Sequence, residues 1–316
     1  MKRFTLIALP LLMLFPFIGL AQNSGVYLKR DFITKYKNKA LITSTIEVHH
    51  SHSNPKGIGT TASDDGDIHA SGIPDAEIGL PVVFEVMNAK KTNNKFKIFP
   101  KAAENNDKVT VTGIWRLWFE HPGEIQTQGD AVVLDPDNTN PDHMFEIHPV
   151  TSVKTATDTV DFRHTFARIK NGTKEFKYKD PVTALNEFSS KELTIKPDGD
   201  FVGLISKKVG YNYIKFKAEL LEKPTHQLDD NEGFTVYATI LDSDGEELVN
   251  KIRLVFVNGT TVANKVKSMN EGQKITLLGI PRVSLALVDW RLNHPGNGNE
   301  RLKWNLPYEL VILASF

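Results

Sequence analysis

The sequence contains no cysteine among its 316 residues. That absence excludes a disulfide scaffold, a thiolate metal site, a thiol nucleophile and a lipobox-type lipoprotein anchor. The chain also has no excess of charge of one sign, because 38 lysine and arginine residues balance 38 aspartate and glutamate residues. Domains whose main task is to coat nucleic acid are usually strongly basic, so this balance argues against nucleic acid as a partner.

Several signatures of known chemistry are missing as well. The chain has no Walker loop, no HExxH, no GxSxG and no dinucleotide fingerprint. After the amino-terminal residues, no apolar run is long enough to span a bilayer. Hydrophobic residues make up 40% and charged residues 24%, which is ordinary globular composition with enough apolar surface for a sizeable core. The length corresponds to roughly two domains.

The amino-terminal residues resemble a secretory signal. Lys2 and Arg3 form a positive start, residues 4–20 are apolar, and Gly19 and Ala21 place small residues before a cleavage point. We therefore expect residues 1–21 to be a signal peptide cleaved after Ala21, and the mature protein to be secreted or periplasmic. The alternative is an N-terminal membrane anchor.

Most of the mature chain has the pattern of short strands. Runs rich in valine, isoleucine, threonine and aromatics alternate with clusters of glycine, asparagine, aspartate and proline. Residues 181–193 are the clearest helical candidate, since Pro181 suits a first turn and apolar residues follow at helical spacing. The expected strands are residues 40–49, 66–71, 82–87, 108–119, 144–153, 213–221, 234–241, 251–257, 273–278, 285–292 and 308–313.

The chain also repeats itself. Four segments of the first half recur in the second half in the same order, at offsets between 163 and 173 residues. Four matches in order indicate an internal duplication rather than chance. The matched pairs are Asn88 with Asn258, Gly113 with Gly279, His121 with His294, and Glu146 with Glu309.

The duplication predicts an all-β protein of two tandem OB-like five-stranded barrels. The first copy contributes five expected strands, and a longer connection separates the third from the fourth, as in the partly open Greek-key OB barrel. A β-sandwich is the competing architecture, because strand spacing alone does not separate the two. The expected domains are residues 22–154, which carry the candidate site, and residues 201–316, a degenerate copy. A connector with a short helix, residues 155–200, joins them.

Polar residues that occur in only one copy are candidates for chemistry, and copy one holds seven of the ten histidines. Side chains alternate along a strand, so Asp67 and His69 share a face, as do Glu146 and His148. In an OB barrel with strand order 1-2-3-5-4 these pairs lie on neighbouring strands beside Glu85. Two histidines with two or three carboxylates suit a divalent metal of the zinc, manganese or iron kind. We expect the metal ligands to be Asp67, His69, Glu146 and His148.

The same residues also have a structural interpretation. Asp65, Gly66 and Asp67 form a sequence typical of turns, in which glycine takes a positive φ and aspartate caps the backbone. Glu146 is matched by Glu309 in the copy that lacks the histidines, which is compatible with a buried structural glutamate. The equivalent of His148 is Val311, an apolar residue. Both interpretations stay open at the level of sequence.

Two further features are candidates for binding. The run from His49 to His52 places His50 and His52 on one face, where they either hold a ligand or belong to a solvated loop. In the strand that ends at His121, Trp118 lies on the same face as Arg116 and Glu120. An aromatic among charges is typical of a platform for a small ligand or glycan, and equally of a ring packed beneath residues 123–142.

Three segments carry a resemblance to known proteins. Asp65-Gly66-Asp67-Ile68-His69, the strand 113–121 and Phe145-Glu146-Ile147-His148-Pro149-Val150-Thr151 resemble a family of uncharacterised bacterial exported domains with DGDxH and ExHPVT segments. The resemblance covers about residues 60–155 and implies no established activity.

Asp-Gly-Asp at the start of a barrel strand is also similar to the staphylococcal-nuclease-like OB fold, which implies calcium binding by Asp67. The Asp-Thr-Pro-Glu segment of that family is absent, and Glu85 stands where an arginine is expected.

We therefore expect an exported module that binds a divalent metal (zinc, manganese or calcium) or another small ligand through domain 1. A metal-dependent hydrolase of the phosphodiesterase or nuclease class is the alternative, with Glu85 or Glu120 as the base. A third hypothesis is a surface protein-interaction module without a small ligand.

Overall fold

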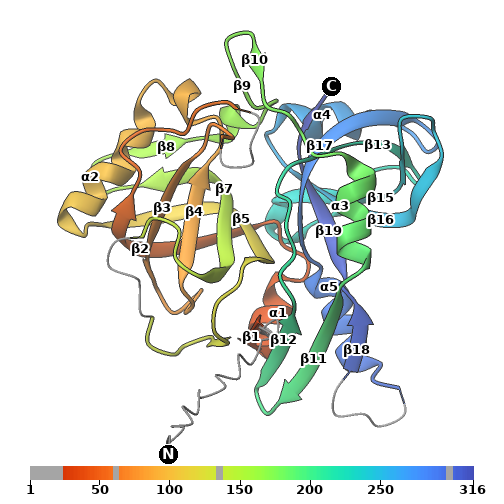
Figure 1. Cartoon of the computed structure of the whole chain (residues 1–316), viewed down its shortest axis with the longest axis horizontal. Coiled ribbons are helices and arrows are strands. Elements are labelled where there is room, and N and C mark those ends of the chain that lie inside the picture. Colours follow the sequence, from red (N-terminus) through yellow and green to blue (C-terminus); the bar gives the residue numbers. More distant parts are fainter. Residues whose placement is uncertain (1–23, 60–63, 133–137, 297–301) are drawn as a thin grey trace, which may run out of the picture.

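The computed structural model describes residues 24–59, 64–132, 138–296 and 302–316. The signal peptide expected in residues 1–21 lies outside these ranges. Figure 1 shows two β-rich lobes side by side, with a further sheet below the junction between them. Among the helices of the described residues, none has the length and apolar character needed to cross a membrane.

The first lobe is a closed barrel of five strands with the OB order 1-2-3-5-4. Its first strand pairs with the second and fourth, and its third strand pairs in parallel with the fifth, which closes the barrel. The short strand β8 (Thr159–Asp161) extends the sheet beyond the fifth strand. The barrel strands are β2 (Leu41–Ser51), β3 (Ile68–Pro74), β4 (Val82–Val86), β5 (Lys108–His121) and β7 (His143–Lys154).

The second lobe repeats this arrangement strand for strand. Its first strand pairs with the second and fourth, and its third and fifth strands are again parallel. The two-residue strand β14 (His226–Gln227) adds to its edge. The barrel strands are β13 (Ile214–Leu220), β15 (Gly233–Leu241), β16 (Glu247–Val257), β17 (Lys274–Val283) and β19 (Tyr308–Ser315). The predicted pair of OB-like barrels is therefore confirmed.

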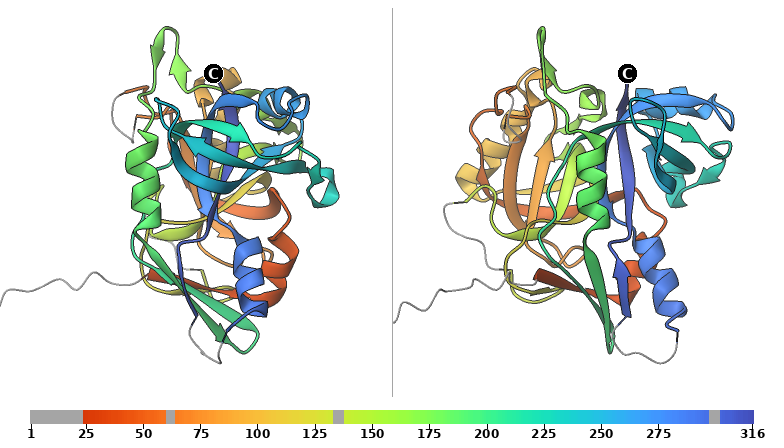
Figure 2. Two further views of the ribbon diagram at one scale, coloured as in Figure 1. Left: turned by 90° about the vertical axis from the view of Figure 1, so that its right-hand side faces the viewer. Right: turned by 45° about the vertical axis from the view of Figure 1, so that its right-hand side comes forward.

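A third sheet, which the sequence pattern did not indicate, lies beneath both barrels (Figure 2). It draws its strands from all three predicted segments of the chain. Its central strand β12 pairs with β11 on one side and with the amino-terminal β1 on the other. The strands are β1 (Ser24–Lys29), β6 (Gln126–Thr127), β11 (Glu192–Asp198), β12 (Phe201–Ser206) and β18 (Leu302–Asn305).

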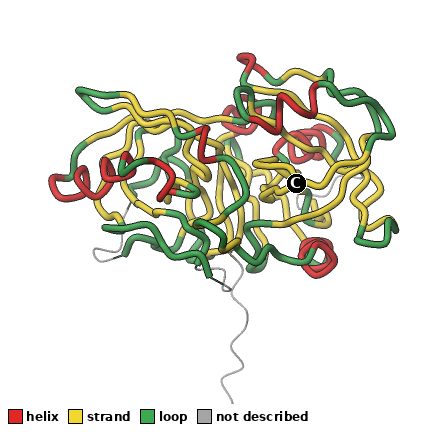
Figure 3. The backbone as a smooth tube through the Cα atoms, turned by 90° about the horizontal axis from the view of Figure 1, so that it is seen from above, coloured by secondary structure: helices red, strands yellow, loops and turns green. Residues whose placement is uncertain are grey.

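The helices are short and lie on the outside of the sheets, as the view from above shows (Figure 3). α2 and α4 occupy the same connection in the two barrels, between the third and fourth strands. A hairpin of β9 (Lys170–Asn171) and β10 (Lys174–Glu175) projects above the barrels (Figure 1). The α-helices are α1 (Arg30–Tyr36), α2 (Ile98–Asn105), α3 (Pro181–Ser189), α4 (Thr261–Lys267) and α5 (Leu285–Asn293), and the 3-10 turns are η1 (Ala89–Thr92), η2 (Lys95–Lys97), η3 (Arg163–Thr165) and η4 (Asp229–Asn231).

The helix expected at residues 181–193 is α3, which ends at Ser189 before β11 begins. The strand expected at residues 285–292 is wrong, since this segment is α5. Ser284 caps the helix by accepting a hydrogen bond from the Leu287 amide. The two buried residues of the helix, Leu285 and Val288, are spaced for one helical face and not for a strand. His294 ends this helix whereas His121 ends a strand, so their match in sequence is not a match in structure.

Each barrel contains a buried arginine–glutamate pair at equivalent positions. In barrel 1, Arg116 Nη1 lies 2.6 Å from Glu146 Oε2, and in barrel 2, Arg282 Nε lies 2.7 Å from Glu309 Oε1. Both arginines are at most 1% exposed. The matched glutamates of the sequence repeat are therefore the structural partners of matched arginines.

These arginines also join the barrels to one another in a reciprocal way. Arg116 Nε donates to the carbonyl oxygen of Pro281 at 2.9 Å, and Arg282 Nη1 donates to the carbonyl oxygen of Trp115 at 3.1 Å. Trp115 and Pro281 each precede the arginine of their own copy. The fourth strands β5 and β17 thus meet about a pseudo-two-fold relation that the duplicated sequence itself creates.

Candidate metal centre

A polar cluster lies on the outer face of barrel 1, where β3, β4 and β7 run side by side. Ile68 and Phe84 point into the apolar core, so their neighbours point to the other face. His69 is the register partner of Glu85, and Glu146 is the register partner of Val83. The predicted convergence of these strands on one face is therefore present in the structure.

Three members of the cluster stand close enough to share one ion. Asp67, Glu85 and His148 each offer a ligand atom within 4.8 Å of the others. His148 Nε2 lies 3.4 Å from Asp67 Oδ2, and His148 Nδ1 lies 3.4 Å from Glu85 Oε2. Asp67 and His148 are fully buried and Glu85 is 4% exposed. The set is one imidazole and two carboxylates, enclosed by protein.

Hydrogen bonds satisfy only part of this cluster. Glu85 Oε2 lies 3.1 Å from His69 Nε2, but neither this contact nor that with His148 has hydrogen-bond geometry. Within the described residues, Glu85 Oε2 and the Nδ1 atoms of His69 and His148 have no hydrogen-bond partner. Buried polar atoms almost always have a hydrogen-bond partner in native proteins, so three such atoms without one in a single place need an explanation.

The charges of the cluster are unusual for a protein interior. Burial alone would lower the pKa of His148, but Glu85, Asp67 and Glu146 outweigh it and raise the pKa well above its ordinary value. Burial would raise the pKa of Glu85, yet the positive charges on His148 and His69 lower it. Buried carboxylates are thus balanced by protons on imidazoles. A bound divalent cation supplies the same compensation without those protons.

Asp67 connects the cluster to the backbone around it. Its Oδ1 accepts a hydrogen bond from the Asn88 amide at 3.1 Å, while its Oδ2 faces His148. Asp65 Oδ1 accepts from the Asp67 amide, and Gly66 between them has a φ of +84°. Burial and the charge of Asp67 raise the pKa of Asp65 to about 7. The turn chemistry expected for this segment and the inward-facing carboxylate therefore coexist.

Tyr213 is part of the site and was missed by sequence reasoning. It stands just before β13 of barrel 2, and its hydroxyl lies 2.6 Å from His148 Nε2 and donates to Asp67 Oδ2. Burial and the charge of Asp67 raise the pKa of Tyr213 well above its ordinary value, so the hydroxyl is protonated. No pattern within barrel 1 points to Tyr213, because its place depends on how the two barrels pack.

His69 and Glu146, the other expected ligands, flank the three central residues. His69 is paired with Glu85, lies 3.3 Å from Lys56 Nζ, and stacks on His52 with ring centroids 5.2 Å apart. Glu146 is held by Arg116 and by His143, whose Nε2 lies 3.1 Å from Glu146 Oε1. Their predicted function as metal ligands stays a prediction.

The residues expected to bind a small ligand lie beside the cluster and are covered. Arg116 is fully buried, and its Nη2 lies 3.2 Å from Glu120 Oε2. Burial raises the pKa of Glu120, although Arg116 opposes the shift. Trp118 is 1% exposed, packs edge-on against Phe188 of α3, and donates its indole N–H to the carbonyl of Gly210. Its ring is buried, and α3 covers one edge of it through Phe188.

The histidine run 49–52 divides between two environments. His49 pairs with Glu47 in an exposed part of β2. His52 is half-buried against His69 and lies 2.8 Å from Thr139 Oγ1. Burial, followed by the charges of His69 and Lys56, lowers the pKa of His52 to about 4. Of this run, only His52 therefore reaches the cluster, through its contact with His69.

The equivalent face of barrel 2 shows which residues are specific to barrel 1. Strand register aligns Ile68 and Val86 with Phe234 and Phe256. The residues at the positions of Asp67, His69, Glu85 and His148 are then Gly233, Thr235, Val255 and Val311. The duplicated scaffold thus carries a polar set in one copy and a small or apolar set in the other.

Comparisons with known proteins add little to this picture. No family model matches the chain, and no curated protein matches it. The resemblance to exported domains with DGDxH and ExHPVT segments therefore stays a prediction. Among solved structures, the chain is similar to the wild-type single-stranded DNA binding protein from Thermus aquaticus. The identity is 6%, the match covers 88% of this chain and 93% of that chain, and the TM-score is 0.21.

Two further solved structures are similar to the same degree. A deletion mutant of the Thermus aquaticus protein is 7% identical over 88% of this chain and 94% of that chain, with a TM-score of 0.21. A replication protein A heterotrimer bound to ssDNA is 9% identical over 77% of this chain and 45% of that chain, with a TM-score of 0.21.

Proposed function

We propose that this protein is a metal-binding module in which Asp67, Glu85 and His148 hold one divalent cation. The observation that carries the proposal is the compact, buried triad with unpaired atoms on Glu85 and His148. One imidazole and two carboxylates match the ligands that zinc and manganese take in proteins. Calcium takes six to eight oxygen ligands, so the histidine favours zinc or manganese.

The duplication explains why Glu146 is not in the proposed ligand set. Its equivalent Glu309 pairs with Arg282 in a barrel without the histidines. The same pairing with Arg116 therefore accounts for Glu146 in barrel 1. Asp67, Glu85 and His148 have no counterpart of the same kind, and they are the part of the cluster that needs a separate explanation.

Burial favours a cation that stabilises the structure over one that performs catalysis. Catalytic zinc keeps a position open for water or substrate. Here the triad is at most 4% exposed, and Tyr213 of barrel 2 closes over His148 and Asp67. A cation bound here tightens the junction of the barrels, and a hydrolase activity would require the cover to move. Export of the protein stays a prediction from its amino-terminal residues.

The test is metal content and thermal unfolding of residues 22–316 purified without a histidine tag. Zinc or manganese at a hundredfold excess over its Kd stabilises the folded state by about 2.7 kcal/mol. For a chain of this size that corresponds to an increase of about 4 °C in the unfolding midpoint. We expect one equivalent of metal by elemental mass spectrometry, and its loss in His148→Gln and Glu85→Gln.

The matched control is the double variant His49→Gln/His50→Gln, which removes two histidines outside the triad. It should keep both the bound metal and the thermal shift. Wild-type protein that takes up no metal after dialysis against zinc, manganese and calcium would refute the proposal. Equal loss of metal in the control would do the same, since the binding would then come from exposed histidines.

A further inference from the structure

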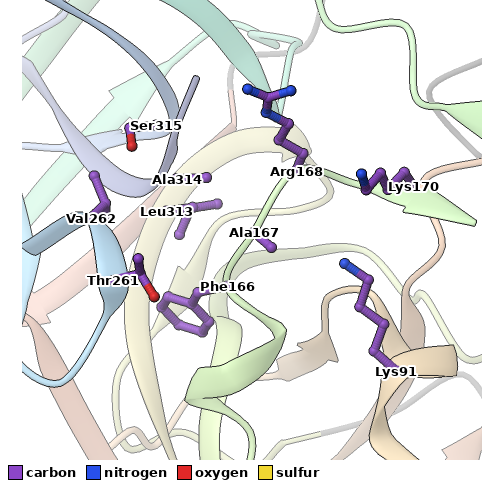
Figure 4. A pocket seen from close by; sticks show the side chains of 10 residues that line it. All are labelled: Lys91, Phe166, Ala167, Arg168, Lys170, Thr261, Val262, Leu313, Ala314 and Ser315. Carbon is purple, nitrogen blue, oxygen red and sulfur yellow. The ribbon is translucent and has the colours of Figure 1, made fainter. Parts of the chain in front are cut away.

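A cavity of about 270 Å³ lies where three parts of the chain meet (Figure 4). These parts are η1 of barrel 1, the segment that follows η3, and the edge of barrel 2 formed by α4 and β19. Its apolar wall is made by Phe166, Val262 and Leu313, which are 5%, 2% and 1% exposed. This wall lies outside the candidate metal centre and shares no residue with it.

The lining also carries positive charge. Lys91, Arg168 and Lys170 contribute three cationic groups, and the lining includes no carboxylate. Figure 4 shows the Lys91 side chain extending toward the segment that carries Arg168 and Lys170. The guanidinium of Arg168 lies over the Phe316 ring, 4.4 Å from its centroid. In a chain with a formal net charge of zero, three cations in one lining are a local excess of positive charge.

The proximity of the two lysines has an electrostatic consequence. Burial and the charge of Lys170 lower the pKa of Lys91. The two ammonium groups therefore oppose one another across the cavity, and an anion between them would relieve that repulsion.

The cavity is held in shape by hydrogen bonds from a buried residue. Asn88 Nδ2 donates to the carbonyl oxygen of Thr165 at 2.9 Å, and Asn88 Oδ1 accepts from the Lys170 amide at 3.3 Å. These bonds fix both ends of the segment that supplies Phe166 and Arg168. An apolar wall with a few polar or charged groups beside it is the usual form of a small-molecule site.

We propose that this cavity binds a small phosphomonoester, with the phosphate between Lys91 and Lys170 and the organic group against the apolar wall. A phosphomonoester carries a charge of about −1.5 to −2 at neutral pH, which suits a site with several cations. Arg168, which lies over the Phe316 ring, adds a third positive charge to the lining. A volume of about 270 Å³ admits a phosphate with a single ring, but no larger cofactor.

The test is calorimetric titration of the full chain at low ionic strength with phenyl phosphate, inorganic phosphate and phenyl sulfate. We expect phenyl phosphate to bind most tightly, because it alone combines the apolar ring with the higher charge. In Lys91→Gln/Lys170→Gln the affinity should fall by about tenfold or more, since two charge-assisted contacts are lost.

The matched control is Lys90→Gln/Lys174→Gln, which removes the same charge from exposed positions that do not line the cavity. It should bind phenyl phosphate as the wild type does, and circular dichroism should show both variants folded. Equal weakening in the control would overturn the proposal, as would the lack of saturable binding of phenyl phosphate at millimolar concentration. Inorganic phosphate or phenyl sulfate binding as tightly as phenyl phosphate would overturn the assigned ligand class.

Discussion

Replacing Arg282 by methionine tests whether reciprocal arginine contacts hold the two barrels together. Methionine keeps most of the length and apolar volume of the side chain but removes every donor. Arg282 donates to Glu309 within its own barrel and to the carbonyl oxygens of Trp115, Ala40 and Lys39 in the other. Its guanidinium also lies 3.6 Å from the centroid of the Trp115 ring.

The expected loss of stability follows from the burial of Arg282. Breaking a buried ion pair by removing one partner costs about 3–5 kcal/mol, because the remaining charge is left in the interior. Glu309 keeps Arg253 as a second partner, with Arg253 Nη1 3.1 Å from Glu309 Oε2, so we place the loss at that carboxylate at the lower end of the range. Three carbonyl oxygens lose a donor as well. We therefore expect a loss of about 4 kcal/mol in the free energy of unfolding.

Urea denaturation, followed by tryptophan fluorescence and by circular dichroism, measures this loss. Because most of the lost contacts cross from one barrel to the other, we expect the two probes to separate in Arg282→Met and to coincide in the wild type. Arg253→Met is the control, since it contacts the same glutamate from a more exposed position and should cost about 1 kcal/mol. A loss below about 1 kcal/mol in Arg282→Met, or an equal loss in the control, would refute the reasoning.

Two further predictions concern packing and capping. A Cβ on Gly113 would lie 2.4 Å from Ile147 Cγ2 and 2.8 Å from a backbone oxygen, whereas the nearest atom to a Cβ on Gly279 is 3.2 Å away. Gly113→Ala should therefore lower the free energy of unfolding by about 2–3 kcal/mol and Gly279→Ala by less than about 1 kcal/mol, and equal losses in urea titrations would contradict this. Asp180 caps α3 by accepting from the amide and hydroxyl of Thr183, which lower the pKa of Asp180. Asp180→Ala should cost about 1 kcal/mol at neutral pH. Because the pKa is lower in the folded state, the charge-dependent part is fully present above the unfolded-state pKa and is lost as pH falls through the lowered folded-state pKa, and a difference independent of pH would contradict the assignment.

The barrels could be predicted because duplication repeats every local signal. Ten of the expected segments recur as the barrel strands, and the long connection before the fourth strand marks the OB order in both copies. The internal repeat predicts a strand at residues 285–292, because the segments on either side of it match the first copy. The segment forms a helix instead, because the Ser284 side chain caps its amino-terminal end.

The third sheet could not be predicted from the same signals. Strands β6 and β18 have two and four residues, too short for a periodic pattern. β12 belongs by sequence to the second half of the chain, yet it pairs with β1 from the amino-terminal end. Pairing between such distant segments depends on how the barrels pack, which the sequence of either copy does not specify.

The candidate site was partly predictable for a different reason. Alternation along strands places Asp67, Glu85 and His148 on one face whenever the OB order is correct. Their mutual distances depend on side-chain conformations, which is why Glu85 was expected to act as a base but lies among the three central residues. Tyr213 reaches the site from the other barrel, and Trp118 is covered by α3. Both facts arise from tertiary packing that no local pattern encodes.

The duplication also bears on whether the polar cluster exists for stability. In both copies this face is buried. Burial costs little free energy where the side chains are apolar, or where the charges are compensated. Barrel 2 uses the apolar solution, with Val255 and Val311 fully buried at the positions of Glu85 and His148. Since the same scaffold folds with valines there, stability does not require the charged set. Retaining buried charges whose atoms lack hydrogen bonds costs free energy in barrel 1, and the proposed cation would offset that cost by binding those atoms.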